Sequence, residues 1–156
     1  MEIKKKLKRD LMPQRIKRAK KDLETLSHTF VRRRDSIKPE VIGGYCFDCG
    51  EYAEGQHFQA GHFETSGGHG VLLRYHPDNM HGQSGGCNMK QRQEVVKINY
   101  TCKMQERYGV ERFNQLRQLK NKSVKADILW YEKLIELYKE GDEKKIIHWL
   151  ENEQNP

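Results

Sequence analysis

The chain has 156 residues, of which 35% are hydrophobic and 33% are charged, and its formal net charge is +7. This length predicts one domain with a modest apolar core, and no apolar run approaches the roughly 20 residues that span a bilayer, which excludes a membrane protein. The first ten residues, MEIKKKLKRD, lack the apolar segment of a signal peptide. We therefore expect a cytoplasmic protein, in which paired cysteines favour metal binding over a disulfide.

The excess positive charge lies in the N-terminal quarter of the chain. Residues 1–38 contain 14 Lys and Arg against 5 Asp and Glu, whereas residues 120–156 contain 7 against 8. A basic quarter suits a polyanionic partner held at one face. A basic run of this kind can equally be a solvated surface, so charge alone does not establish nucleic-acid binding.

The first predicted elements are an arm and a helix. Residues 1–13 are polar and rich in lysine and end at Pro13, which predicts a flexible basic arm. From Gln14 to about Ser36, apolar residues recur near every 3.6 positions, which predicts an amphipathic helix ended before Pro39. The apolar positions of this helix are Ile16, Leu23, Leu26, Phe30 and Val31.

Three consecutive arginines, Arg32, Arg33 and Arg34, fall near the end of this predicted helix. Consecutive residues fan over most of a helix circumference, because each step turns the helix by about 100°. At least one of the three should therefore face the core or a nucleic acid.

The middle of the chain is rich in glycine and predicts short elements joined by turns. Residues 41–45 predict a short strand or turn, and residues 52–63 predict two short strands that break at Glu54-Gly55 like a hairpin. Residues 64–70 (ETSGGHG) predict a flexible loop, residues 71–75 form a short apolar run, and residues 76–79 (HPDN) carry a turn signal.

The rest of the chain predicts helices. A long helix is expected over residues 88–108 and ends at Gly109, with Val95, Ile98 and Cys102 on its packed face. Three more helices are expected over residues 111–119, 124–139 and 142–151. Amphipathic C-terminal helices of this kind could form the interface of a homodimer.

Three of the four cysteines indicate a zinc site. Cys46-Phe-Asp-Cys49 is a CxxC motif followed by Gly50, which can adopt the positive φ of a zinc-knuckle turn. A redox-active CxxC is the less favoured interpretation, because no βαβ pattern surrounds the motif. Cys87 comes later, at the start of a predicted helix, where the second half of a split zinc site would lie.

The fourth zinc ligand is open in the sequence. A cysteine would be expected three residues before Cys87, but Ser84 stands there, and serine is a poor zinc ligand. The fourth ligand could be His81, His57 or water, or the site could be degenerate.

A second group of polar residues suggests a catalytic cation. His62 closes a predicted strand, Asn79 lies in a turn, and Asn88 opens a helix just after Cys87. A strand pair followed by a helix can hold one divalent cation, a histidine can deprotonate water at neutral pH, and an Asn or His can bind the metal. Taken singly, each of these residues would be explained as well by a local hydrogen bond.

The order CxxCG, AGHF, LRYHPDNMHGQ and CN resembles an HNH-type nuclease, and more narrowly the NinG (Rap) recombination nucleases of lambda-type phages. Residues 30–35 (FVRRRD) are similar to that family's lead-in to the CxxC, and residues 59–62 (QAGH) to its AGH motif. Residues 73–75 (LRY) and 78–83 (DNMHGQ) match further motifs, and the resemblance covers about residues 24–120.

The resemblance implies an α+β fold: a ββα-metal (HNH, treble-clef-like) core with a zinc knuckle, flanked by a basic N-terminal helix and several C-terminal helices. The expected organisation is a flexible arm over residues 1–13, a nuclease domain over residues 14–120, and a C-terminal helical extension over residues 121–156 packed on the same domain. The expected location is the cytoplasm of a bacterial host, for a phage-encoded protein.

The implied activity is structure-directed DNA cleavage in phage recombination, on branched intermediates such as D-loops and Holliday junctions. His62 would be the general base, oriented by Asn79, with Arg74 facing the scissile phosphate. Asn88 would bind catalytic Mg²⁺ or Mn²⁺, with His81 as a second ligand. Structural zinc would be held by Cys46, Cys49 and Cys87, and DNA by Arg32, Arg33, Arg34, Lys90 and Arg92.

Two residues depart from the family pattern. Ser84 replaces an expected cysteine, and Gln59 replaces a usual acidic residue, which removes a carboxylate that could bind the catalytic cation. An alternative is therefore a zinc-stabilised DNA-binding module without catalytic activity. A third interpretation is an HNH restriction or homing enzyme that reads sequence.

Overall fold

The computed structural model describes residues 2–64 and 70–153, and its fold is mixed α+β. Most described residues are helical, and the strands form two small antiparallel sheets. The helices are α1 (Glu2–Arg34), α2 (Gly70–Arg74), α3 (Gly85–Met89), α4 (Glu94–Tyr108), α5 (Val110–Gln118), α6 (Ile128–Glu140) and α7 (Glu143–Asn152). The strands are β1 (Gly43–Tyr45), β2 (Tyr52–Glu54), β3 (Phe58–His62) and β4 (Met80–Ser84). Within the described ranges, no helix is both long and apolar enough to cross a bilayer.

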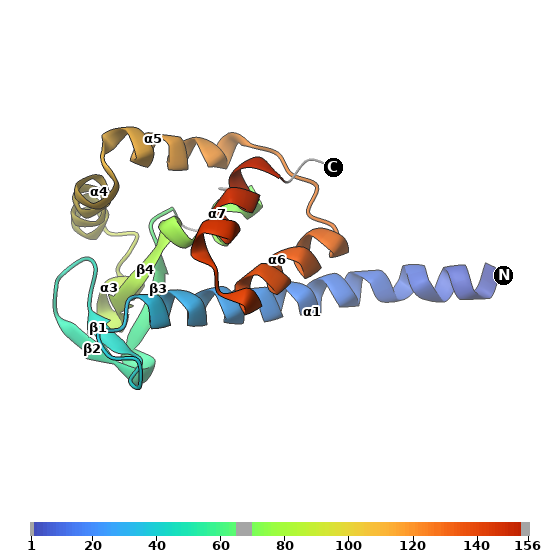
Figure 1. Ribbon diagram of the computed structural model, residues 1–156, viewed down its shortest axis with the longest axis horizontal. Coiled ribbons are helices and arrows are strands. Elements are labelled where there is room, and N and C mark those ends of the chain that lie inside the picture. The colour runs from blue at the N-terminus through green and yellow to red at the C-terminus, as the bar shows by residue number, and fades with distance from the viewer. Residues whose placement is uncertain (1, 65–69, 154–156) are drawn as a thin grey trace.

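Helix α1 is longer than the sequence predicts. It begins at Glu2 and not at Gln14, and it continues through Pro13, which costs the helix one backbone hydrogen bond because proline has no N–H. Figure 1 shows α1 lying along α6, with its N-terminal end reaching beyond the rest of the protein. The predicted apolar face is confirmed, since Leu23 and Val31 are buried and Ile16, Leu26 and Phe30 pack against the core.

Two clusters of buried side chains form most of the core. The larger one joins α1, α2, α6 and α7 and includes Leu23, Leu72, Leu134 and Ile146. The second lies between α4 and α5 and includes Tyr100, Met104 and Phe113. The C-terminal helices α6 and α7 thus bury their apolar faces against α1 and α2.

The strand pairing differs from the predicted hairpin. The two strands predicted over residues 52–63 exist as β2 and β3, but they do not pair with each other. Instead β1 pairs with β2 around the CxxC loop, and β3 pairs with β4, with Phe58 opposite Ser84 and His62 opposite Met80. A 3-10 turn at Gly55–His57 separates β2 from β3 and redirects the chain.

The predicted helix over residues 88–108 is interrupted. Helix α3 ends at Met89, and α4 begins only at Glu94, after Gln93 adopts an extended backbone. Neither glycine nor proline occurs in residues 90–93, so the break has no local signal. It coincides with a tertiary contact, because the side chain of Gln91 donates hydrogen bonds to the carbonyl of His62 and to Gln83.

The packed face of α4 was also predicted wrongly. Val95 and Ile98 are 70% and 54% exposed, and Cys102 is exposed as well. The buried side chains are Val96, Tyr100 and Met104, one or two positions further along the helix. Both sets recur at helical spacing, and the Tyr100 hydroxyl, which donates to Gly61 and contacts His81, selects the second.

Arg34 connects four elements of the fold. Its guanidinium donates to both carboxylate oxygens of Asp35, to Glu143 in α7, and to the carbonyls of Pro77 and Met80, at 2.7–3.1 Å. These contacts use all five of its N–H groups. Burial opposes the charge of Arg34, but the two carboxylates outweigh it and hold the pKa of Arg34 above its ordinary value.

Replacing Arg34 should therefore destabilise the protein. We expect Arg34→Met to lower the free energy of unfolding by about 3 kcal/mol, because it leaves the mostly buried Asp35 carboxylate without its charged partner. Its neighbour Arg33 is exposed, and Arg33→Met should change the free energy by less than about 0.5 kcal/mol. Urea denaturation of both variants measures the difference, and equal stability of the two would contradict the assignment.

Candidate functional site

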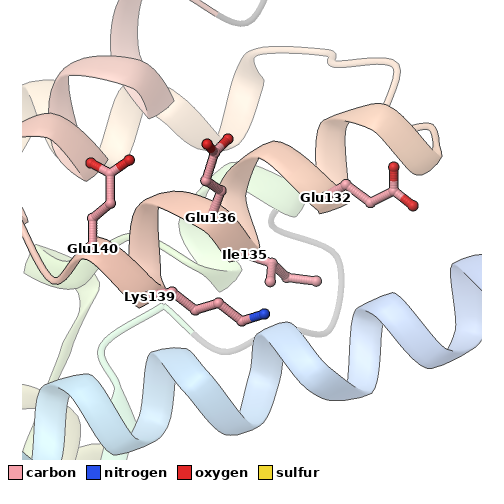
Figure 2. Close-up of a pocket in the computed structure, with 5 residues that line it drawn as sticks. All are labelled: Glu132, Ile135, Glu136, Lys139 and Glu140. Carbon is pink, nitrogen blue, oxygen red and sulfur yellow. The ribbon is translucent and has the colours of Figure 1, made fainter.

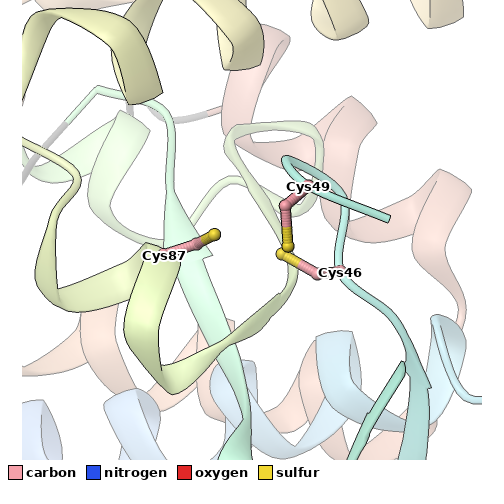
Figure 3. A group of neighbouring side chains, drawn as sticks. All are labelled: Cys46, Cys49 and Cys87. Carbon is pink, nitrogen blue, oxygen red and sulfur yellow. The ribbon is translucent and has the colours of Figure 1, made fainter. Parts of the chain in front are cut away.

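Three cysteines meet at one point of the structure. Cys46 and Cys49 lie in the loop between β1 and β2, Cys87 lies in α3, and their sulfur atoms all lie within 4.8 Å of one another. Figure 3 shows the three side chains pointing toward a common centre. The predicted grouping of Cys46, Cys49 and Cys87 is thus confirmed, whereas Cys102 lies apart from it and is exposed.

The CxxC loop is held by backbone hydrogen bonds. Gly50 has a φ of 77° and donates its N–H to the carbonyl of Cys46 at 2.9 Å. The N–H of Phe47 donates to the carbonyl of Gly82 at 2.8 Å, which attaches the loop to β4. A side chain on residue 50 would be strained at this φ, so the glycine permits the turn.

The sulfur atoms have different electrostatic surroundings. Burial opposes a thiolate at Cys46, but N–H groups of Cys49, Ser84 and Asp48 donate to its sulfur and lower its pKa overall. Burial raises the pKa of Cys87 to about 12 in the absence of a cation. Three thiols around one centre fit the donor set of zinc, and a bound zinc ion would supply the positive charge that turns them into thiolates.

Ser84 stands where a fourth cysteine was expected, and it has a structural role there. Its hydroxyl accepts a hydrogen bond from the N–H of Cys87 at 3.3 Å and so caps the N-terminus of α3. Serine is among the preferred N-cap residues. The Ser84 hydroxyl also contacts the sulfur of Cys46.

His81 is not part of the cysteine group. It is buried, and its Nδ1 and Nε2 atoms lie 3.0 and 2.8 Å from the hydroxyls of Tyr100 and Tyr108. Its ring stacks on Phe47 with ring centroids 3.9 Å apart. Both ring nitrogens are thus engaged inside the protein, and His81 is positioned to tie β4 to α4.

His62 lies at the end of β3 and faces α1. Its Nε2 lies 2.9 Å from the carbonyl oxygen of Arg74, and its ring meets the ring of His28 edge-on with centroids 5.4 Å apart. A carbonyl oxygen only accepts, so in the neutral ring Nε2 carries the proton and Nδ1 has the free lone pair. Burial lowers the pKa of His62 to about 4, so that the ring is neutral at pH 7.

Asn79 and Arg74 surround the His62 contact. Asn79 is buried, and its side chain donates to the carbonyls of Glu64 and Leu73 and accepts from the N–H of Glu64, at 2.9–3.1 Å. It therefore fixes the residues that flank His62 and Arg74. The Arg74 guanidinium is partly exposed and pairs with Glu24 of α1 at 3.2 Å.

Asn88 lies among neutral amides. Its side chain donates to Gln59 at 2.8 Å, and a Cβ added at Gly61 would lie 3.1 Å from its Oδ1 and overlap the side chain of Gln83. Gly61 thus permits the close approach of α3 to β3. Buried Gln83 accepts from Gln91, while its own Nε2 has no hydrogen-bond partner among the described residues.

The expected catalytic group does not converge on one point. Side chains alternate along a strand, so His62 shares a face of the β3–β4 pair with Ala60 and Met80, which pack on α1. Gln59, Gly61 and His81 lie on the opposite face, toward α3 and α4. The residues proposed as base and as cation ligands therefore lie on different faces of the hairpin.

The predicted DNA-binding residues also divide. Arg34 is fully engaged within the fold, and Arg32 donates to the carbonyl of Gly55. Arg33, Lys90 and Arg92 are exposed. Lys90 and Arg92 lie in the turn between α3 and α4, on either side of the Gln91 that contacts the His62 carbonyl.

Sequence reasoning missed three residues that belong to these groups: His28 beside His62, Gln91 beside the His62 carbonyl, and Asp48 beside the cysteines. Asp48 lies inside the CxxC motif, so its proximity to zinc ligands could have been noticed. His28 and Gln91 had no comparable signal, since only the folded chain brings α1 and the α3–α4 turn to β3.

A pocket on α6 lies away from these groups. It is lined by Glu132, Ile135, Glu136, Lys139 and Glu140, and Figure 2 shows these side chains projecting from one helix. Three carboxylates at four-residue spacing repel a phosphate backbone, so this pocket does not suit DNA.

Comparison with known proteins identifies a family. A family model described as bacteriophage lambda NinG protein matches residues 2–147. Comparisons with curated proteins and with solved structures found no match.

Zinc content tests the cysteine group directly. We expect about one zinc ion per chain after extensive dialysis, because three thiols that already lie together in the fold can bind the ion tightly enough to retain it. Cys46→Ser should lose this zinc and unfold at lower temperature, whereas Cys102→Ser, at an exposed cysteine outside the group, should keep it. Elemental analysis and thermal denaturation give the answer, and a folded, zinc-free wild-type protein would overturn the assignment.

The ring of His62 should titrate far below an ordinary histidine. Its pKa of about 4 in the folded protein lies under the 6.5 of the unfolded chain, so the unfolded state binds more protons between these values. The contribution of His62 to stability is thus complete above pH 6.5 and is lost as the pH falls toward 4. NMR titration of the His62 ring measures this, and a midpoint at or above 6.5 would contradict it.

Proposed function

Because the chain belongs to the bacteriophage lambda NinG protein family, we propose that it acts in phage recombination as a DNA endonuclease that cuts branched intermediates. D-loops and Holliday junctions are the substrates that the family resemblance suggests. The observation that supports the proposal best is the setting of His62: a neutral imidazole with an unprotonated nitrogen, on a residue whose backbone carbonyl accepts from Gln91 in an exposed basic turn.

In the proposed reaction, His62 removes a proton from the attacking water. Its Nδ1 accepts that proton as water adds to the phosphorus, and the bond from phosphorus to the leaving oxygen breaks. The lowered pKa of His62 keeps this nitrogen unprotonated at neutral pH. Asn79 keeps the ring oriented by fixing the segment that contributes the Arg74 carbonyl. The charge of the Arg74 guanidinium acts on His62 and would offset that of a phosphate bound there.

Phosphate contacts come from exposed cations. Lys90 and Arg92 flank Gln91, whose side chain donates to the backbone carbonyl of His62, so a DNA strand along this turn would lie beside that backbone, on the face of β3 opposite the imidazole. Arg33 adds positive charge at the end of α1, whereas Arg34 and Arg32 are engaged by the fold. Affinity that rests on such contacts falls steeply as the salt concentration rises.

A catalytic Mg²⁺ or Mn²⁺ remains part of the proposal on the strength of the resemblance alone. The groups around Asn88 are neutral amides, and His81 is occupied by two tyrosines. Among the described residues, the three cysteines are the only group of His, Cys, Asp or Glu side chains close enough to hold a metal. These residues do not form a Mg²⁺ site.

The same observation favours a second candidate function. A protein that keeps the cysteine centre and the basic turn, but has only amides where an acidic ligand is usual, could bind DNA without cutting it. Gln59 and Asn88 form the amide pair in question.

Paired cuts across a junction would require two active sites, so the endonuclease proposal includes a homodimer.

One cleavage assay separates the two functions. Purified protein would be incubated with duplex, flap, D-loop and four-way DNA, with Mg²⁺ or Mn²⁺. We expect branched DNA to be cut, and His62→Ala to cut at least roughly 100-fold more slowly while binding DNA as before, because it removes only the base. His148→Ala, at an exposed histidine of α7, is the control and should keep full activity.

Two outcomes would count against the endonuclease. The first is DNA binding without cleavage under either metal, which would support the non-catalytic module. The second is equal activity of His62→Ala and the control, which would exclude His62 as the base. Cleavage at one fixed sequence in duplex DNA would instead indicate an enzyme that reads sequence.

A further inference from the structure

The cysteine centre has three sulfur donors, and zinc in structural sites almost always takes four ligands. The missing ligand is a question about the metal centre itself, and its answer does not depend on whether the protein cuts DNA.

Two groups named as alternatives are poorly placed. Both ring nitrogens of His81 are hydrogen-bonded to tyrosine hydroxyls, and His57 is exposed in the turn between β2 and β3. Neither belongs to the set of ligand atoms within 4.8 Å of one another.

Ser84 is near the sulfur atoms, but it is already used. Its hydroxyl accepts from the N–H of Cys87 and contacts the sulfur of Cys46. A serine hydroxyl is also a weak zinc ligand, because it is neutral at pH 7 and rarely loses its proton. Ser84 therefore caps α3 and favours the thiolate form of Cys46.

Asp48, unlike Ser84, has a side-chain oxygen without a hydrogen-bond partner among the described residues. It lies between Cys46 and Cys49 in the loop and is only 5% exposed. Its carboxylate contacts the thiol of Cys87, and its Oδ1 is buried without a hydrogen-bond partner among the described residues. A buried carboxylate oxygen without a partner is costly, and a divalent cation beside it would remove that cost.

We propose that Asp48 supplies the fourth ligand, so that the centre binds zinc through three cysteines and one aspartate. Carboxylate oxygen is an ordinary zinc ligand, and Asp48 already lies beside one of the three sulfur atoms. It does not belong to the set of atoms within 4.8 Å of one another, so binding requires its side chain to move toward the three sulfur atoms.

The chain offers matched variants for a test by metal affinity. Zinc affinity would be measured by competition with a chelator, on the full-length protein. Asp48→Asn should weaken zinc binding at least roughly 100-fold, more than the loss of an outer-shell partner. Ser84→Ala removes another group that contacts the cysteine sulfur atoms, and it should weaken zinc binding less than about tenfold. The reverse order would make Ser84 the ligand and overturn the proposal.

A second measurement distinguishes a ligand from a neighbour of the ligands. With Co²⁺ in place of zinc, EPR in ¹⁷O-enriched water reveals whether water is bound to the metal. The wild-type protein should show no bound water, and Asp48→Ala should show it. Bound water in the wild-type protein would overturn the proposal, because the fourth position would then be open.

A double variant guards against simple misfolding. Because the Ser84 hydroxyl already contacts Cys46 and caps α3 at Cys87, a thiol at this position can complete a four-cysteine site. Asp48→Ala combined with Ser84→Cys should therefore recover tight zinc binding and exclude the water. Recovery would show that Asp48→Ala fails through loss of a ligand; failure of the double variant to bind metal would contradict the assignment of the site.

Discussion

The guanidinium of Arg34 holds together elements that are distant in the chain, and the position of the three-cysteine group depends on it. Arg34 binds Asp35, and Asp35 accepts the N–H of Gly82 in β4 at 2.7 Å. The carbonyl of Gly82 in turn accepts the N–H of Phe47 in the CxxC loop. A continuous series of hydrogen bonds thus runs from the end of α1 through β4 to the cysteines. Since every donor of Arg34 is used in this way, the basic charge of this residue serves the fold and is not available to a polyanion.

The β3–β4 hairpin separates two chemical environments. One face carries His62 and packs on α1, where His28 and the Arg74 carbonyl surround the imidazole. The other face carries His81, enclosed by two tyrosines of α4, and the amides next to Asn88. Asn79 donates to the carbonyls of Glu64 and Leu73, and Gln91 donates to the carbonyl of His62, so both side chains fix the backbone around His62. A proton acceptor and a cation at this hairpin would therefore have to act across the backbone of β3.

The sequence was informative where the pattern is local. The apolar spacing of α1 identified its buried face, and the CxxC motif with Cys87 identified the three cysteines that lie together, because the ligand spacing of a zinc knuckle is short and strict. Features that depend on tertiary contacts were missed. The pattern of apolar residues along a strand could not show that β2 pairs with β1. The helical spacing of α4 could not show that Tyr100 is buried and Ile98 is exposed. The internal role of Arg34 was equally hidden, since its acceptors come from four segments of the chain.

Helix α1 also gives the protein a long reach. Its 33 residues, at about 1.5 Å each, extend roughly 50 Å from Glu2 to Arg34. A flexible chain of the same length would sample many end-to-end distances and lose that freedom on binding, whereas a continuous helix sets one distance in advance. A molecule that bound the N-terminal end of α1 would thus lie at one set distance from the β3–β4 hairpin. The helix that positions the cysteine loop through Arg34 and Asp35 at one end therefore also keeps its other end at a constant separation from that loop.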